Sequence, residues 1–144
     1  MEHGRFWRGL LTRGVGRRHP SGGLLTPPRI AFFLIRLAPA IIFLVHGSLK
    51  LFGGHHDRTV ALFLTVNIPL AEPAAWIVGA LEMAGGLALL TGVLMRPLAF
   101  LLAIEMAVAI LRVRLPQGFL GGWEFELTLL LICLGIAIRP RGID

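Results

Sequence analysis

Residues 30–52 read IAFFLIRLAPAIIFLVHGSLKLF, a run that is almost entirely apolar. A helix of this length extends for about 34 Å, which is enough to cross a hydrocarbon core of about 30 Å. Arg36, Pro39, His46 and Lys50 interrupt the run. We therefore expect a membrane-spanning helix that carries polar side chains on part of its surface.

Three further apolar runs follow along the chain, at residues 74–94, 98–113 and 123–138. The pair Arg96-Pro97 leaves room only for a very short turn, so the helices before and after it must be antiparallel neighbours. The sequence thus predicts an all-α polytopic membrane protein, a four-transmembrane-helix bundle whose membrane domain covers residues 30–139.

Two polar excursions separate these runs. Residues 59–66 follow a polar patch and are too short to span a bilayer, so we expect a small interfacial helix that is capped at its N-terminus by Asp57. Residues 116–122 form a second loop on the same side of the bundle.

Composition supports lipid as the solvent. Hydrophobic residues make up 56% of the 144 residues and charged residues only 15%, which is too apolar for a soluble domain of this size. The formal charge is +6, but the arginines adjoin apolar runs, which favours a membrane surface over nucleic acid as their partner. Cys133 is the single cysteine, which excludes an intrachain disulfide and a Cys-x-x-Cys redox or zinc motif.

The two ends of the chain differ from its apolar centre. Residues 1–29 contain six arginines, six glycines and three prolines with few apolar residues, and we expect a basic, disordered cytoplasmic tail that the mature protein keeps. Residues 140–144 form a short cytoplasmic tail.

Basic residues predict the orientation of the bundle. With the N-terminus inside, four basic residues lie outside, namely Lys50, Arg58, Arg112 and Arg114. Nine lie on the cytoplasmic side: Arg5, Arg8, Arg13, Arg17, Arg18, Arg29, Arg96, Arg139 and Arg141. This bias predicts that both ends of the multi-pass chain are cytoplasmic.

Charged residues within the predicted spans are the most specific signal in the sequence. A charge near the bilayer centre costs about 2.5–3.5 kcal/mol on insertion scales, so Arg36, Glu82 and Glu105 must face the interior of the bundle or each other. By depth, we expect Arg36 to pair with Glu105, and Lys50 or His46 to pair with Glu82. The candidate polar cluster consists of Arg36, His46, Lys50, Glu82, Glu105 and Glu124. Such residues either hold helices in register or contact a proton, an ion, a substrate or a quinone.

Metal binding is not predicted. His46 is a lone histidine within a span, and His55-His56 lacks a third ligand at a defined spacing.

Several short motifs together resemble the DoxX family of small bacterial four-helix membrane proteins. They are Arg36-Leu-Ala, His46-Gly-Ser-Leu-Lys50-Leu-Phe-Gly53, Glu82-Met-Ala-Gly85-Gly86, Leu90-Thr-Gly92-Val-Leu-Met-Arg96 and Gly121-Gly122-Trp123-Glu124. The resemblance covers about residues 30–140. It implies a multi-pass protein of the bacterial plasma (inner) membrane that is assigned to redox contexts. Relatives are described as small subunits of quinone-coupled thiosulfate oxidation or as membrane partners of antioxidant enzymes.

The resemblance also implies which residues matter. The positions that match the family's motifs are Arg36, His46, Lys50, Glu82 and Glu124. One departure stands at the end of the third span, where relatives often have a histidine and this chain has Arg112 and Arg114.

Three functions compete at this level. The first is an accessory or small subunit of a quinone-linked redox complex, whose quinone cofactor and redox-enzyme partner the chain does not itself supply. The second is a non-catalytic membrane scaffold, whose basic tail binds anionic lipid or a soluble enzyme. The third is a small proton-coupled transporter that uses Glu82 or Glu105. The chain has no self-contained catalytic motif, and its sequence does not specify an oligomeric state.

Overall fold

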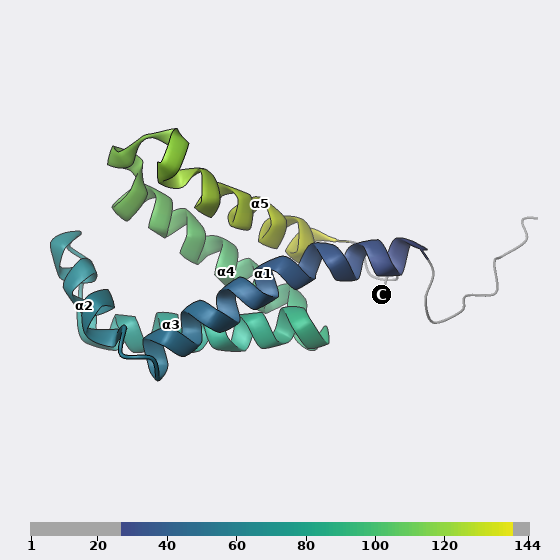
Figure 1. Cartoon of the computed structure of the whole chain (residues 1–144), viewed down its shortest axis with the longest axis horizontal. Helices are drawn as coiled ribbons and strands as arrows, with labels where there is room; N and C mark the ends of the chain where they lie inside the picture. The colour runs from purple at the N-terminus through teal and green to yellow at the C-terminus, as the bar shows by residue number, and fades with distance from the viewer. Residues whose placement is uncertain (1–26, 140–144) are drawn as a thin grey trace, which may run out of the picture.

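The computed structural model describes residues 27–139, and within that range the chain is helical without a strand (Figure 1). The tails predicted at residues 1–26 and 140–144 lie outside the described residues. Five α-helices follow in order: α1 (Pro27–Leu51), α2 (His56–Thr65), α3 (Ala71–Thr91), α4 (Met95–Ala109) and α5 (Glu124–Ile138). Each predicted span and the short helix between the first two thus has a helical counterpart.

Three helical segments are long and apolar enough to cross a membrane: Arg29–Leu51, Ala71–Thr91 and Phe119–Ile138. The helix α4 is shorter, but the chain continues from it without a break into a π-helical segment, Ile110–Arg114. A 3-10 turn, Leu115–Gln117, and a turn at Phe119–Trp123 then lead into α5.

The N-terminus of α2 differs from the expectation. Asp57 lies inside the first turn of the helix, and the residue at the N-cap is His55, which makes no side-chain capping hydrogen bond. The prediction that Asp57 caps the helix was therefore wrong, because Asp57 lies two residues after the N-cap. A carboxylate in the first turn still interacts favourably with the positive end of the helix dipole.

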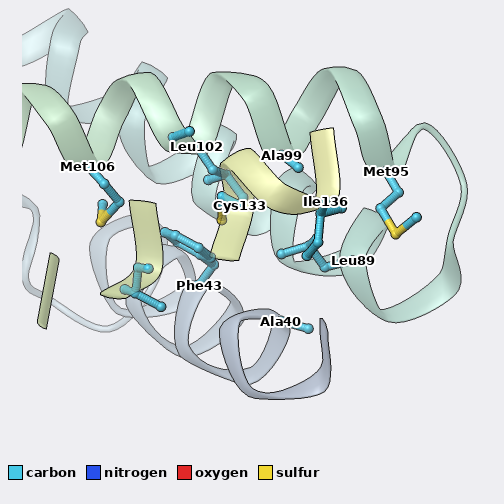
Figure 2. Packing of buried hydrophobic residues seen from close by; sticks show 11 residues of the cluster. Ala40, Phe43, Leu89, Met95, Ala99, Leu102, Met106, Cys133 and Ile136 are labelled. Atoms are coloured by element: carbon cyan, nitrogen blue, oxygen red, sulfur yellow. The ribbon is translucent and has the colours of Figure 1, made fainter. Parts of the chain in front are cut away.

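The bundle is built from two closely packed pairs of helices. The helix α1 crosses α3, and α4 packs along α5, as Figure 1 shows, while α3 also contacts α4. The short helix α2 lies beside the bundle and packs mainly on α3. Buried side chains from both pairs meet in one core, where Phe43, Leu89, Leu102, Cys133 and Ile136 come together (Figure 2).

Glycines allow the backbones of α1 and α3 to approach each other. A Cβ atom placed on Gly47 of α1 would lie 2.6 Å from the backbone nitrogen of Met83 and 2.8 Å from the carbonyl oxygen of Gly79. One placed on Gly86 of α3 would lie 2.8 Å from the backbone nitrogen of Leu44. Small residues at such crossings are the usual means of close helix packing in membranes.

Substituting Gly47→Ala or Gly86→Ala is expected to destabilise the protein, because the new methyl group meets backbone atoms that cannot rotate away. The expected cost is about 1–3 kcal/mol, the range for overpacked sites. Unfolding in mixed detergent micelles with increasing dodecyl sulfate measures it. Gly135→Ala in α5 is the matched control, because no heavy atom lies within 4 Å of its Cβ position. Equal stability losses at Gly47 and Gly135 would contradict the close approach of α1 to α3.

Candidate functional site

A cavity of about 500 Å³ lies among the helices, near the end of α1 and the beginning of α5. Its lining is mostly apolar, but seven charged or imidazole side chains also face it. These are His46, Lys50, Glu82, Glu105, Arg112, Arg114 and Glu126. We call this space the charged cavity.

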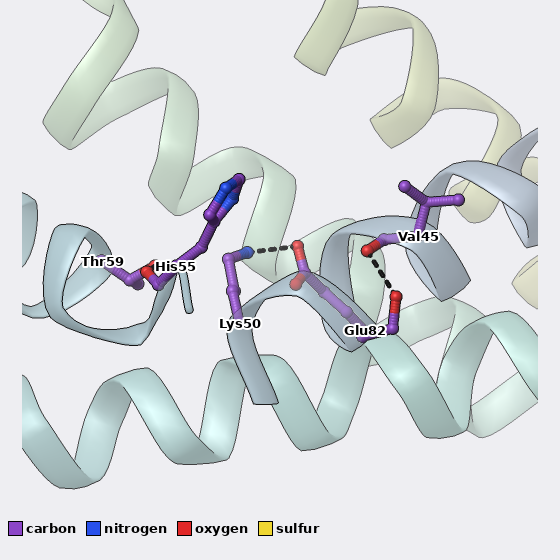
Figure 3. A network of polar contacts seen from close by, with 6 residues as sticks. Val45, Lys50, His55, Thr59 and Glu82 are labelled. Atoms are coloured by element: carbon purple, nitrogen blue, oxygen red, sulfur yellow. Dashed lines mark hydrogen bonds and ion pairs between the residues drawn. The ribbon is translucent and has the colours of Figure 1, made fainter. Parts of the chain in front are cut away.

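An ion pair between α1 and α3 stands at the wall of the charged cavity. The Lys50 Nζ atom lies 2.5 Å from Glu82 Oε1 and donates a hydrogen bond to it. Figure 3 shows Lys50 extending from the end of α1 to the Glu82 carboxylate on α3. The Lys50 side chain is 19% exposed and the Glu82 side chain 4%. The structure thus gives Glu82 one of its two expected partners.

A second carboxyl group, Glu105 of α4, lies beside this pair. The Glu105 and Glu82 side chains both line the charged cavity, and Glu105 lies near enough to Glu82 and Lys50 to interact electrostatically with both. The Oε2 atoms of both residues are buried, and no donor within residues 27–139 bonds to either. Two buried carboxyl oxygens without a donor beside a cavity are well placed to bind a ligand or to hold a proton.

A second ion pair lies on the far wall, where the π-helical segment faces α5. The Arg114 Nε atom donates a hydrogen bond to Glu126 Oε1 at 2.9 Å, and Arg114 Nη1 donates one to the side-chain oxygen of Gln117. Glu126 is buried, whereas the Arg114 side chain is 43% exposed. Sequence reasoning missed Glu126, because α5 is apolar on all sides and no periodicity indicates which of its faces is buried. The only signal in the sequence was that Glu126 lies two residues further into the predicted span than Glu124.

Two members of the predicted cluster lie outside the charged cavity. Arg36 does not meet Glu105 as expected: its Nη1 atom lies 3.6 Å from the sulfur of Met95, near the opposite end of the bundle. Glu124 accepts a hydrogen bond from the backbone nitrogen of Gly121 at 2.9 Å and stabilises the turn before α5. The structure therefore brings together His46, Lys50, Glu82 and Glu105, and separates Arg36 and Glu124 from them.

The histidines occupy the α2 side of the bundle. His46 is exposed at the charged cavity, and His55 lines a smaller adjoining cavity of about 270 Å³ that it shares with Lys50. The His56 ring lies 4.2 Å from the ring of Trp76. Within the described part of the chain, no three histidine, cysteine or acidic side chains are grouped in a way that could hold a metal ion.

The Lys50–Glu82 pair is expected to couple α1 and α3 energetically. Lys50→Met leaves a buried carboxylate without its partner and is expected to cost about 3 kcal/mol, as for other buried pairs that lose one member. The double variant Lys50→Met/Glu82→Gln should be more stable than the two single losses predict by addition. Dodecyl sulfate titration of all three variants checks this.

The Arg114–Glu126 pair provides a comparison for these three variants. Because Arg114 is nearly half exposed, solvent screens the pair and Arg114→Met should cost about 1 kcal/mol or less. Strict additivity at Lys50 and Glu82 would show that the two side chains are not coupled.

Together, the apolar helices and the buried charges around one cavity define a small helical membrane protein. The chain belongs to the DoxX family, whose pattern it matches over residues 31–115. This confirms the resemblance predicted from the motifs. The matched region contains Lys50, Glu82 and Glu105.

The chain is also similar to a protein of Bacillus subtilis (strain 168) that is named "Putative oxidoreductase CatD". The two are 32% identical over 109 residues, which cover 76% of this chain and 78% of the relative. No solved structure matches the chain.

Proposed function

We propose that this protein is an accessory or small subunit of a quinone-linked redox complex, and that the charged cavity receives the quinone head group. The observation that carries the proposal is the Lys50–Glu82–Glu105 group, in which two carboxyl oxygens are buried at the cavity without a donor. The oxidoreductase name of the Bacillus subtilis relative and the redox contexts implied by the family support the same class of function.

The residues fit such a ligand. A quinone head group is a flat apolar ring with two carbonyl oxygens, and the cavity lies in the usual size range for small-molecule sites. Phe43, Phe63 and Met106 offer apolar surface for the ring. Lys50 and Arg114 offer N–H donors for carbonyl oxygens.

Proton handling is the chemical role that we assign to the carboxyl groups. A bound quinone supplies two-electron chemistry, in which its oxygens take up or release two protons. Glu82 and Glu105 both line the cavity, so they can accept and pass protons there. The single cysteine rules out a dithiol within the chain, so the electrons pass to or from a partner redox protein.

A cavity-filling substitution tests quinone binding. Ala109→Phe adds a ring at the lining of the charged cavity and is expected to weaken binding of decyl-ubiquinone or menadione at least about tenfold, because the ring occupies the ligand's space. Isothermal titration of the detergent-purified protein measures this. Ala80→Phe on the exposed side of α3 is the control and should leave affinity within about twofold.

Two results would overturn the proposal. One is the absence of quinone binding by the wild-type protein. The other is equal binding by wild type and Ala109→Phe, which would place the ligand outside the charged cavity. Loss of proton-coupled solute flux in proteoliposomes on Glu82→Gln or Glu105→Gln would instead favour the transporter.

We further propose that the protein crosses the plasma membrane four times with both ends in the cytoplasm. The helix α4 and its π-helical continuation run from Met95 to Arg114, a length of about 30 Å at ~1.5 Å per residue, which suits a fourth span. The described carboxylates avoid one end of the bundle, where Arg29, Arg36, Arg96 and Arg139 lie. An excess of arginine is typical of the cytoplasmic side.

Cysteine labelling separates four spans from three. In a Cys133→Ala background, Asp57→Cys and Gln117→Cys should both react with a membrane-impermeant maleimide added to intact spheroplasts. Both residues are exposed, Asp57 in α2 and Gln117 in the 3-10 turn, and the proposed topology places both outside. Val93→Cys, in the turn between α3 and α4, should react only after permeabilisation. If α4 does not span, Gln117→Cys will be protected while Asp57→Cys still reacts.

A further inference from the structure

Three arginines from three parts of the chain converge at the end of the bundle opposite the charged cavity. They are Arg36 in α1, Arg96 at the start of α4 and Arg139 just after α5, and we call them the arginine cluster. The guanidinium carbons of Arg36 and Arg139 lie 5.9 Å and 3.6 Å from the centre of the same Phe32 ring. The Arg96 Nε atom donates a hydrogen bond to the carbonyl oxygen of Ala137, two residues before Arg139.

No carboxylate in the described part of the chain forms an ion pair with Arg36 or Arg96. The six carboxylates of residues 27–139 are Asp57, Glu72, Glu82, Glu105, Glu124 and Glu126. None of them lies in the start of α1, the α3–α4 turn or the last two turns of α5. The ion pairs of the described residues are those of Lys50 with Glu82 and of Arg114 with Glu126, so neither includes Arg36 or Arg96.

The arginines also repel one another. Desolvation, followed by the positive charges of Arg36 and Arg96, lowers the pKa of Arg139. The Arg36 Nε atom is buried and has no hydrogen-bond acceptor within residues 27–139. A buried guanidinium donor without an acceptor is costly, and an anion that enters the cluster would relieve this cost together with the repulsion.

The surroundings of the cluster indicate what kind of anion fits. The Phe33 ring, whose centre lies 5.3 Å from the guanidinium carbon of Arg36, is 39% exposed. Leu94, next to Met95, and Ile138, next to Arg139, are 69% and 70% exposed. An anion bound here therefore sits beside exposed apolar surface. Inorganic phosphate gains nothing from such surface, whereas a phospholipid places its acyl chains on it.

We propose that the arginine cluster binds the phosphate group of an anionic phospholipid, with Arg36 and Arg96 donating to its oxygens and the acyl chains lying along α1 and the end of α5. The planar guanidinium groups suit this role, because each can present two N–H donors to a phosphate. This site is separate from the charged cavity, and its occupancy does not depend on a quinone.

Lipid titration of the purified full-length protein tests the proposal. The protein, delipidated in a nonionic detergent, is titrated with dioleoylphosphatidylglycerol, dioleoylphosphatidylcholine or inorganic phosphate while its melting temperature is recorded. We expect phosphatidylglycerol to raise the melting temperature at concentrations at which the other two have no effect. Arg36→Gln should raise the half-effective phosphatidylglycerol concentration about tenfold, since it removes a charge-assisted hydrogen bond.

Two further variants complete the test. Arg29→Gln removes the same charge from an exposed position near the same end and should change the half-effective concentration less than about twofold. Arg36→Lys keeps the positive charge but removes the planar guanidinium with its paired N–H donors. It should therefore raise the half-effective phosphatidylglycerol concentration by less than Arg36→Gln does. It also replaces Arg36→Gln if that variant does not fold.

Three outcomes would overturn the proposal. If Arg36→Gln or Arg36→Lys titrates like the wild type, Arg36 does not hold the lipid. If Arg29→Gln raises the half-effective phosphatidylglycerol concentration as much as Arg36→Gln does, the lipid is attracted by the overall positive charge of this end and is not held at a defined site. If inorganic phosphate stabilises the protein as well as phosphatidylglycerol does, the ligand is a soluble anion. None of these results bears on quinone binding in the charged cavity.

Discussion

The ion pair between Lys50 and Glu82 is the interaction on which the rest of this bundle depends. Each charge alone would oppose burial in an apolar environment by several kcal/mol, so each requires the other. The pair joins α1 to α3 at the place where Gly47 lets the two backbones come close. Close backbone packing and charge pairing thus support each other, and together they set the position of α3, on which α2 and α4 pack.

The charged groups give the two ends of the described bundle different chemistry. The charged cavity gathers carboxyl groups together with Lys50 and two arginines, whereas the opposite end carries arginines without carboxylates in the described residues. A carboxyl-rich cavity within apolar helices suits proton exchange with a bound redox ligand. An arginine-rich end suits a phosphate at the membrane surface. The proposals of a quinone at one end and an anionic lipid at the other therefore rest on separate chemistry.

Membership of the DoxX family agrees with the short motifs at residues 36–38, 46–53, 82–86 and 90–96, which lie within the matched region. The motif residues Lys50 and Glu82 are the ones that the structure pairs, and the family match ends at residue 115. The site is completed from outside that match, because α5 contributes Glu126. Its partner is Arg114, at the end of the π-helical segment.

Hydropathy and proline placement alone are sufficient to establish the helical class, the order of the helices, and the need for buried charges to find partners, because each depends on local composition and on the solvent. Depth along each helix even indicates a partner for Glu82. Which side chains meet is a different matter. Arg36 and Glu105 have compatible depths by residue counting, yet α1 extends past its neighbours and Arg36 lies at the α3–α4 turn instead. Helix rotation and offset decide such contacts, and they depend on packing between residues far apart in the chain.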